Sequence, residues 1–188
     1  MPTHQKSADQ VPIKPYKDKL PNIGKDAWVD ETAIVIGDVI LGDHASIWPM
    51  SVLRGDVNQI IIGHRTNIQD GSVLHVTHPG EHSPDGYPLI VGDDVTVGHR
   101  VSLHGCRIGN HCLIGIGAIV MDGAVIGDEV ILGAGSLVPP NRTLESGFLY
   151  LGSPARKARP LTDQEKIFFR YSATHYVSLK NDYLNESE

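Results

Sequence analysis

The feature that most constrains the fold is a column of aliphatic residues that recurs every six positions. Every member of the column is Val, Ile or Leu, and a glycine directly follows many of them. The column consists of Val29, Val35, Leu41, Ile47, Leu53, Ile62, Ile68, Leu74, Val91, Val97, Leu103, Ile108, Ile114, Val120, Ile126, Leu132 and Val138. A fixed short period of this kind indicates a solenoid, in which each repeat packs on its neighbours along the chain.

A period of six matches neither a helix nor simple strand alternation, but it fits a short strand followed by a turn. Three such sides make a coil of about 18 residues, and successive coils lie about 4.8 Å apart. The aliphatic residues then point into a triangular prism of about six coils. This pattern resembles the left-handed β-helix family of hexapeptide-repeat proteins. We therefore predict an all-β solenoid, a left-handed parallel β-helix, followed by a C-terminal α-helix.

Interruptions of the column predict how the chain is organised. Residues 54–61 shift the phase by three, and the polar segment 76–89 reads as a loop inserted into the prism. We expect a polar N-terminal tail over 1–15, the β-helix over 16–140, an extended return segment over 141–161 and a helix over 162–184. Thr162 and Glu165 have the spacing of a capping box at the helix start. The helix face expected to lie along the prism contains Phe169, Ala173, Tyr176, Val177 and Leu184.

Charge and hydropathy exclude several classes of function. The net charge is −6 without a cluster of Lys and Arg, which argues against a nucleic-acid partner. No apolar run approaches the roughly 18 residues of a membrane span. The polar N-terminus lacks the apolar segment of a secretory signal, so we expect a cytoplasmic protein. Cys106 and Cys112 lack metal-site spacing and are predicted to be small buried thiols.

Two histidines are predicted to stack in neighbouring coils. His75 and His104 each directly follow an aliphatic residue of the column. The interval between them equals one complete coil once the extra length of the inserted loop is left out. Their imidazoles should therefore lie about 5 Å apart, which suits two ligands of one metal ion.

A third histidine, His99, is expected to serve a different metal ion from its near neighbour. It precedes His104 by five residues, which is about 16 Å along an extended chain. A cyclic arrangement of three prisms would bring His99 of one chain to His75 and His104 of the next. Six further histidines are expected to lie in turns and loops (His44, His64, His78, His82 and His111) or on the helix surface (His175).

Three ordered motifs make the resemblance more specific. Arg54-Gly55-Asp56, "NIQDGSVLH" at 67–75 and "VGHRVSLHGC" at 97–106 resemble the gamma class of carbonic anhydrases. The segments "YLGSPAR" and "YSATHYV" extend the likeness to the short bacterial branch, from about residue 16 to residue 184.

The resemblance implies a homotrimer with zinc, or else iron or cobalt, held by His75, His99 and His104 at each interface. It implies CO2 hydration to bicarbonate by a metal-bound hydroxide. The resemblance also implies that Gln69, with its neighbour Asn67, orients the bound solvent. It implies an ion pair of Arg54 and Asp56 near the interface, with Asp70 in the same network. It further implies that Tyr176 reaches the site from the helix. Tyr171 is the substitute for Tyr176. Packing of the prism or trimer is the alternative role for Arg54, Asp56 and Tyr176.

One departure from the family pattern affects the proton shuttle. Val57 stands where the best-known active form carries a glutamate, and the inserted loop carries Glu81, Asp85, His78 and His82 instead of that form's acidic loop. Of these, His78 and His82 are the replacement candidates by position.

Proteins with other functions can have the same prism, since a fold does not by itself determine function. A metal-dependent thioesterase or accessory protein could use the same site. A hexapeptide-repeat acyltransferase with CoA needs one histidine base and no metal triad, which fits the stacked pair poorly. A scaffold with a purely structural metal is the fourth candidate.

Overall fold

Every residue of the aliphatic column lies in a strand of a parallel solenoid. All of them are buried except Val29 at the N-terminal end, which is half-buried. Successive coils stack in register, so that Val97 pairs with Ile68 on one side and Ile114 on the other. The predicted left-handed parallel β-helix is confirmed, and the inward branched side chains form its core.

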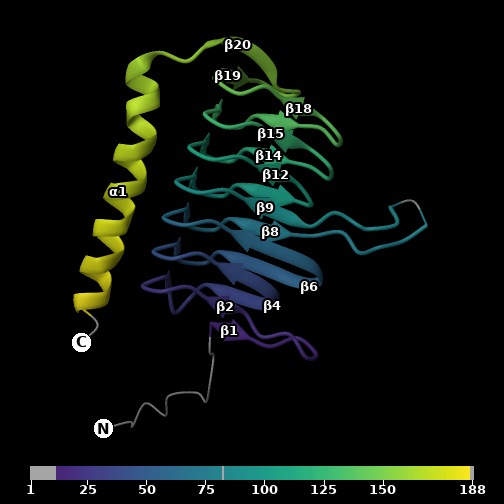
Figure 1. Cartoon of the computed structure of the whole chain (residues 1–188), viewed down its shortest axis with the longest axis vertical. Helices are drawn as coiled ribbons and strands as arrows, with labels where there is room; N and C mark the ends of the chain where they lie inside the picture. The colour runs from purple at the N-terminus through teal and green to yellow at the C-terminus, as the bar shows by residue number, and fades with distance from the viewer. Residues whose placement is uncertain (1–11, 82, 187–188) are drawn as a thin grey trace, which may run out of the picture.

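The computed structural model describes residues 12–81 and 83–186, and Figure 1 shows the coils stacked along its long axis. One side of the prism contains seven parallel strands and a final antiparallel one: β3 (Trp28–Val29), β5 (Ser46–Ile47), β7 (Asn67–Ile68), β10 (Thr96–Val97), β13 (Leu113–Ile114), β16 (Ile131–Leu132), β19 (Phe148–Leu151) and β20 (Arg156–Pro160).

The other two sides are joined in one sheet, because two long strands continue round the corner between them. These are β4 (Ile34–Leu41) and β6 (Val52–Ile62). One of the two sides continues through β1 (Ile13–Lys14), β8 (Val73–His75), β11 (Ser102–His104), β14 (Ile119–Val120) and β17 (Leu137–Val138). The other continues through β2 (Asn22–Ile23), β9 (Leu89–Val91), β12 (Arg107–Ile108), β15 (Val125–Ile126) and β18 (Thr143–Leu144).

The solenoid extends beyond the predicted limits at both ends. β1 already pairs with β4, before residue 16, while residues 1–11 of the expected tail lie outside the described residues. Beyond residue 140, β18 and β19 still pair in parallel with the preceding coil. The physical reason is that Leu144 and Tyr150 continue the six-residue spacing and are buried in the core. The prediction ended too early because Pro139-Pro140 precedes them and because Tyr150 is aromatic, unlike the rest of the column. The return segment begins only at β20.

The two interruptions become two local insertions on the prism. In β6 the register with β4 shifts between Gly55 and Ile60, so the intervening residues bulge outward. The segment between β8 and β9 is a hairpin with isolated bridges Thr77–Tyr87 and Gly80–Ser83, and it projects at the right in Figure 1. Asn58 in the bulge donates from Nδ2 to the carbonyls of Thr77 and Asp85, which ties the two insertions together.

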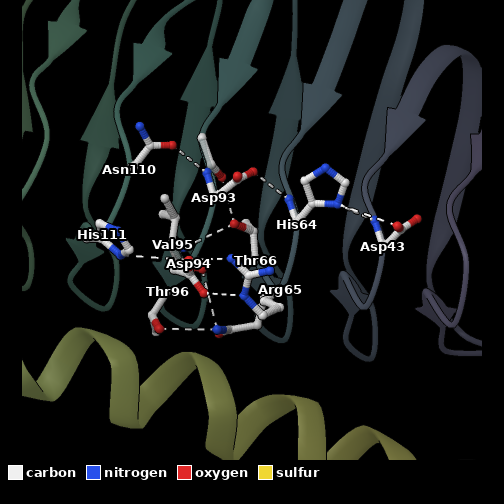
Figure 2. A network of polar contacts seen from close by, with 12 residues as sticks. Asp43, His64, Arg65, Thr66, Asp93, Asp94, Val95, Thr96, Asn110 and His111 are labelled. Carbon is white, nitrogen blue, oxygen red and sulfur yellow. Dashed lines mark hydrogen bonds and ion pairs between the residues drawn. The ribbon is translucent and has the colours of Figure 1, made fainter.

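A ladder of polar bonds closes one corner of the prism, as Figure 2 shows. The His64 imidazole accepts a hydrogen bond from the backbone N–H of Asp43, and the Asp93 carboxylate accepts one from the backbone N–H of His64. The side-chain amide oxygen of Asn110 accepts one from the backbone N–H of Asp93. Asp128 continues the ladder by accepting from Asn110. Each side chain therefore pairs with a backbone N–H of the preceding coil that would otherwise lack a partner in the turn.

Helix α1 (Asp163–Glu186) runs back along the stacked coils. The predicted capping box is confirmed, since the Thr162 hydroxyl accepts the Glu165 N–H and the Glu165 carboxylate accepts the Thr162 N–H. Phe169 and Ala173 are buried as expected, but Leu184 is 39% exposed. Lys180 is fully buried in the helix interface instead, four residues earlier on the same side. No helix among the described residues is long and apolar enough to cross a membrane.

The two cysteines belong to the core and not to a site. Cys106 and Cys112 are both free thiols and each is 1% exposed, at core positions that Ala124 and Val130 occupy in the next coil. Burial raises the pKa of each thiol to about 12. They therefore behave as small hydrophobic residues, as predicted.

Adjacent residues of one strand provide a test of the core. Ile126 is 1% exposed inside the prism, and Val125 beside it is 38% exposed on the outer face. We expect Ile126→Ala to lower the free energy of unfolding by about 2–5 kcal/mol, because it leaves a cavity between stacked coils. The control Val125→Ala should cost less than about 1 kcal/mol. Urea denaturation at equal protein concentration measures both, and similar losses would contradict the assigned orientation of the strand.

Candidate metal centre

The predicted stacking of His75 on His104 is confirmed. The two residues pair in register at the ends of β8 and β11. Their ring centroids are 5.0 Å apart, and His75 Nδ1 lies 3.0 Å from His104 Nε2. The parallel pairing of the coils thus brings one nitrogen of each ring to a common point on the outside of the prism.

The outer nitrogen of each ring faces a carboxylate. His75 Nε2 is 3.1 Å from Asp56 Oδ1, and His104 Nδ1 is 2.6 Å from Asp122 Oδ1. An ionised carboxylate can only accept, so each outer nitrogen carries the proton. Both inner nitrogens then direct lone pairs at one another, an arrangement that a cation between them stabilises. The donor set therefore fits a metal ion with imidazole ligands and carboxylates behind them.

Arg54 completes this half of the site by pairing with Asp56. Burial alone would raise the pKa of Asp56, but hydrogen bonds from Arg54 and His75 outweigh it and lower that pKa. Burial lowers the pKa of His75, while the hydrogen bond to Asp56 opposes that shift. Asp56 is therefore an anion and His75 a neutral imidazole near pH 7, which is the form that binds a metal. We call Arg54, Asp56, His75, His104 and Asp122 the paired-histidine half-site.

His99 lies apart from this pair, in the turn that leads from β10 into β11. Its Nδ1 is 2.9 Å from Asp70 Oδ2, so it also has a carboxylate partner and an Nε2 that remains for a ligand. Within the described part of one chain, no three His, Cys, Asp or Glu side chains are grouped to hold a metal ion. The described part of one chain therefore does not bring His99 together with His75 and His104.

The residues around His99 line a cavity of about 410 Å³ between the prism and α1. Gln69 and Tyr176 line it together with apolar side chains that include Leu113, Ile131 and Phe168. Gln69 Nε2 donates to Asn67 Oδ1 at 3.1 Å, and Asn67 Nδ2 donates to Thr96 Oγ1 at 3.1 Å. Thr96 in turn bonds Ser172 of α1, so the helix holds this buried network in place.

Tyr176 packs edge-on against Trp48, with ring centroids 5.5 Å apart. Burial raises the pKa of Tyr176, and the charge of Asp70 raises it further. The phenol therefore remains a neutral hydrogen-bond donor at physiological pH. Tyr171, the predicted substitute for Tyr176, is 62% exposed and stacks on His175 instead. We call His99, Asp70, Gln69, Asn67 and Tyr176 the tyrosine half-site.

The other described histidines differ from these three. His64 serves the corner ladder in Figure 2, and His111 Nδ1 is 3.8 Å from the nearest Asp94 oxygen, beyond hydrogen-bond range. His78 is exposed in the hairpin and His175 is exposed on the helix, while His82 lies outside the described residues. A close His–carboxylate bond therefore distinguishes His75, His99 and His104 from the rest.

Sequence reasoning missed Asp122 and Thr77. Asp122 bonds His104 through one oxygen and accepts from the Thr77 hydroxyl through the other, at 3.1 Å. Asp122 follows His104 by one complete coil, which was a usable signal for their contact. Thr77 carried no such signal, because the hairpin breaks the repeat.

Comparisons with known proteins place this architecture among the hexapeptide-repeat proteins. The family model described as bacterial transferase hexapeptide (six repeats) matches residues 21–55 and 105–140. A hexapeptide transferase family protein from Anaplasma phagocytophilum has a similar crystal structure, with a TM-score of 0.83 and 38% identity. That likeness covers 91% of this chain and 97% of the other.

Relatives found by sequence similarity identify the family more specifically than the shared fold does. A carbonic anhydrase of Geobacillus kaustophilus is 45% identical over 81% of this chain and 80% of its own length. Protein YrdA of Escherichia coli is 57% identical over 93% of this chain and 95% of its own length. The chain belongs to the gamma-class carbonic anhydrase-like family.

The ionisation of Tyr176 tests the tyrosine half-site. Because the charge of Asp70 is one cause of the raised pKa of Tyr176, Asp70→Asn should lower that pKa toward its usual value of 10.0. It should stay above that value, since burial remains. A pH titration of ¹³C-labelled tyrosine by NMR measures the shift, with Asp128→Asn as a control carboxylate in the corner ladder. An unchanged pKa of Tyr176 in Asp70→Asn would contradict the described proximity.

Proposed function

We propose that this protein is a metal-dependent carbonic anhydrase of the gamma class, which hydrates CO2 reversibly to bicarbonate at sites shared between chains of a homotrimer. The observation that carries the proposal is the set of three histidines, each with one ring nitrogen on a carboxylate and the other available. They are divided between two half-sites that lie apart in the described part of one chain. Membership of the family supports the same activity. The cytoplasmic location stays a prediction from the sequence.

Exposed apolar residues between the half-sites support the assembly. Val73 is 48% exposed and Ile119 is 41% exposed, and both lie on the side of the prism that ends in His75 and His104. Ile116, stacked one coil beyond His99, is 49% exposed. A contact in which one chain presents the paired-histidine half-site and the next presents the tyrosine half-site is heterologous, and a rotation of about 120° between chains would close it as a ring of three. Three such contacts complete three sites.

The histidine ligands suit zinc, with iron or cobalt as alternatives, because neutral imidazoles bind all three. A divalent ion with three neutral ligands and an open position supplies a Lewis acid that lowers the pKa of water to about 7. Asp56, Asp70 and Asp122 hold the outer ring protons of the three histidines. Arg54 keeps Asp56 ionised, so the imidazole that Asp56 supports remains oriented and basic.

Gln69 and Tyr176 are placed to act on the reacting molecules. Asn67 accepts from the Gln69 amide and is itself held by Thr96, which fixes the orientation of that amide. The Gln69 carbonyl oxygen is an acceptor only, so it can orient a water molecule without changing the charge of the site. The neutral Tyr176 phenol can donate to an oxygen of CO2 or bicarbonate. Apolar neighbours in the cavity exclude competing water from this position.

Mixed trimers test the sharing of ligands. His99→Ala and His75→Ala should each abolish metal binding in homotrimers while the prism remains folded, because each removes one ligand from every site. A trimer that contains both variants should recover one complete site, where the intact pair of one chain meets the intact His99 of its neighbour. Metal analysis of tag-selected mixed trimers measures this, with His111→Ala as a control.

Two outcomes would count against this assignment. One tightly bound metal ion per chain in homotrimeric His99→Ala would show that His99 is not a ligand. Verified mixed trimers without any recovered metal would exclude sites shared between chains.

The activity itself is tested by stopped-flow CO2 hydration on protein purified without oxygen, with metal counted in the same sample. We expect a rate proportional to zinc or iron occupancy. His75→Ala should reduce it by at least about 100-fold, since the ligand set is lost. Hydration without dependence on bound metal would contradict the proposal.

Hydrolysis of a small thioester is the second candidate, and the cavity beside His99 favours it. Its volume of about 410 Å³ and its apolar lining would accommodate a short acyl group, which CO2 does not require. Full metal occupancy without CO2 hydration, together with metal-dependent thioester cleavage, would decide for this activity. Transfer of the acyl group from CoA to an amine in the absence of metal would instead indicate an acyltransferase.

A further inference from the structure

We propose that Asp122 is a positioning residue, which fixes the ring orientation and tautomer of His104 so that Nε2 is the nitrogen presented beside His75. The inference rests on the proposed metal centre, and it concerns a residue outside the motifs that mark the family resemblance. It is carried by the contacts of Asp122, which join the segments that hold the paired histidines.

Both carboxylate oxygens of Asp122 are engaged. Oδ1 lies 2.6 Å from His104 Nδ1, and Oδ2 accepts from the Thr77 hydroxyl at 3.1 Å. Thr77 follows His75 by two residues, at the start of the hairpin. One side chain therefore contacts the ring of one histidine and fastens the segment directly after the other. The carboxylate cannot rotate without breaking one of these two bonds.

The backbone around Asp122 is shaped to allow this contact. Asp122 lies in the turn after β14, where its carbonyl accepts the Asn141 N–H, and the Gly123 N–H bonds the Gly105 carbonyl. Gly105 directly follows His104 and has φ +50°. A Cβ on Gly105 would lie 2.3 Å from Asp122 Oδ1, so any larger residue would push the carboxylate away from the ring.

The tautomer follows from the chemistry of the contact. A neutral imidazole carries one proton, and the ionised carboxylate of Asp122 holds it on Nδ1. The Nε2 lone pair is then directed at the point that His75 Nδ1 also faces, 3.0 Å away. Without Asp122 the proton can occupy Nε2, which removes the lone pair from that point. The carboxylate also makes the imidazole a stronger donor toward a cation.

The test compares Asp122→Ala and Asp122→Asn with Thr77→Val, and it uses Asp128→Asn as the matched control. Asp128 lies six residues further along the chain and accepts a backbone N–H in the corner ladder. The first readout is the ¹⁵N NMR spectrum of the His104 ring in metal-free protein, at a pH where the ring is neutral. The second is the zinc dissociation constant from competition with a chelator. Circular dichroism verifies the fold of each variant.

We expect His104 to be protonated at Nδ1 in the unaltered protein and to shift toward protonation at Nε2 in Asp122→Ala. Zinc affinity should fall about 10–100-fold in that variant, and by less in Asp122→Asn and Thr77→Val. Asp128→Asn should change neither quantity. If Asp122→Ala does not fold, the two conservative variants decide by the same readouts. An unchanged tautomer together with unchanged zinc affinity in folded variants would overturn the inference.

The two proposals fail in different ways. Absence of CO2 hydration by the metal-loaded protein would overturn the proposed activity, yet it would leave the tautomer and affinity results intact. Absence of zinc binding in the unaltered protein would overturn the metal centre. The His104 tautomer in metal-free protein would still show whether Asp122 controls the ring.

Discussion

The parallel stacking of coils in register is the interaction on which the rest of this structure depends. Each inward aliphatic residue contacts its equivalents in the coils on either side, as Val97 does with Ile68 and Ile114. Because the coils repeat with a fixed length, this packing also determines which outward residues meet. His104 lies against His75 for the same reason that Leu103 lies against Leu74. The hydrophobic core of the prism and the geometry of the candidate site therefore have one origin.

The insertions add what a perfect repeat could not provide. The bulge in β6 carries Asp56 to the outer nitrogen of His75. The hairpin after β8 carries Thr77 to Asp122, and Asn58 connects the bulge to the hairpin. Both insertions lie on the outside of the prism, so they leave the stacking of the aliphatic column undisturbed. Local departures from the repeat thus supply the polar groups that surround the histidine pair.

The electrostatic design of the site is a set of imidazole–carboxylate bonds divided between two half-sites. Each carboxylate holds one ring proton outward and leaves one lone pair for a cation. Two lone pairs that face one another are unfavourable in the free chain, and so is an exposed apolar surface between the half-sites. Association of chains and binding of a metal ion would relieve both, which couples assembly to the proposed chemistry.

Much of this protein's structure could be predicted from its sequence. The aliphatic column determined the solenoid, since a period of six is compatible with few other folds. The one-coil interval determined that His75 and His104 meet, because the position of a residue in a strict repeat sets its neighbours. The capping box of Thr162 and Glu165 marked the start of the helix. In each case the structure depends on residues that are close in the sequence or related by the repeat. The same periodicity also carried a signal for the contact of Asp122 with His104 and for the burial of Leu144 and Tyr150. Only the tertiary structure decided that Thr77 reaches Asp122 and that Lys180 is buried. Those outcomes depend on side-chain orientation and on the depth of helix packing, which arise from contacts between distant segments.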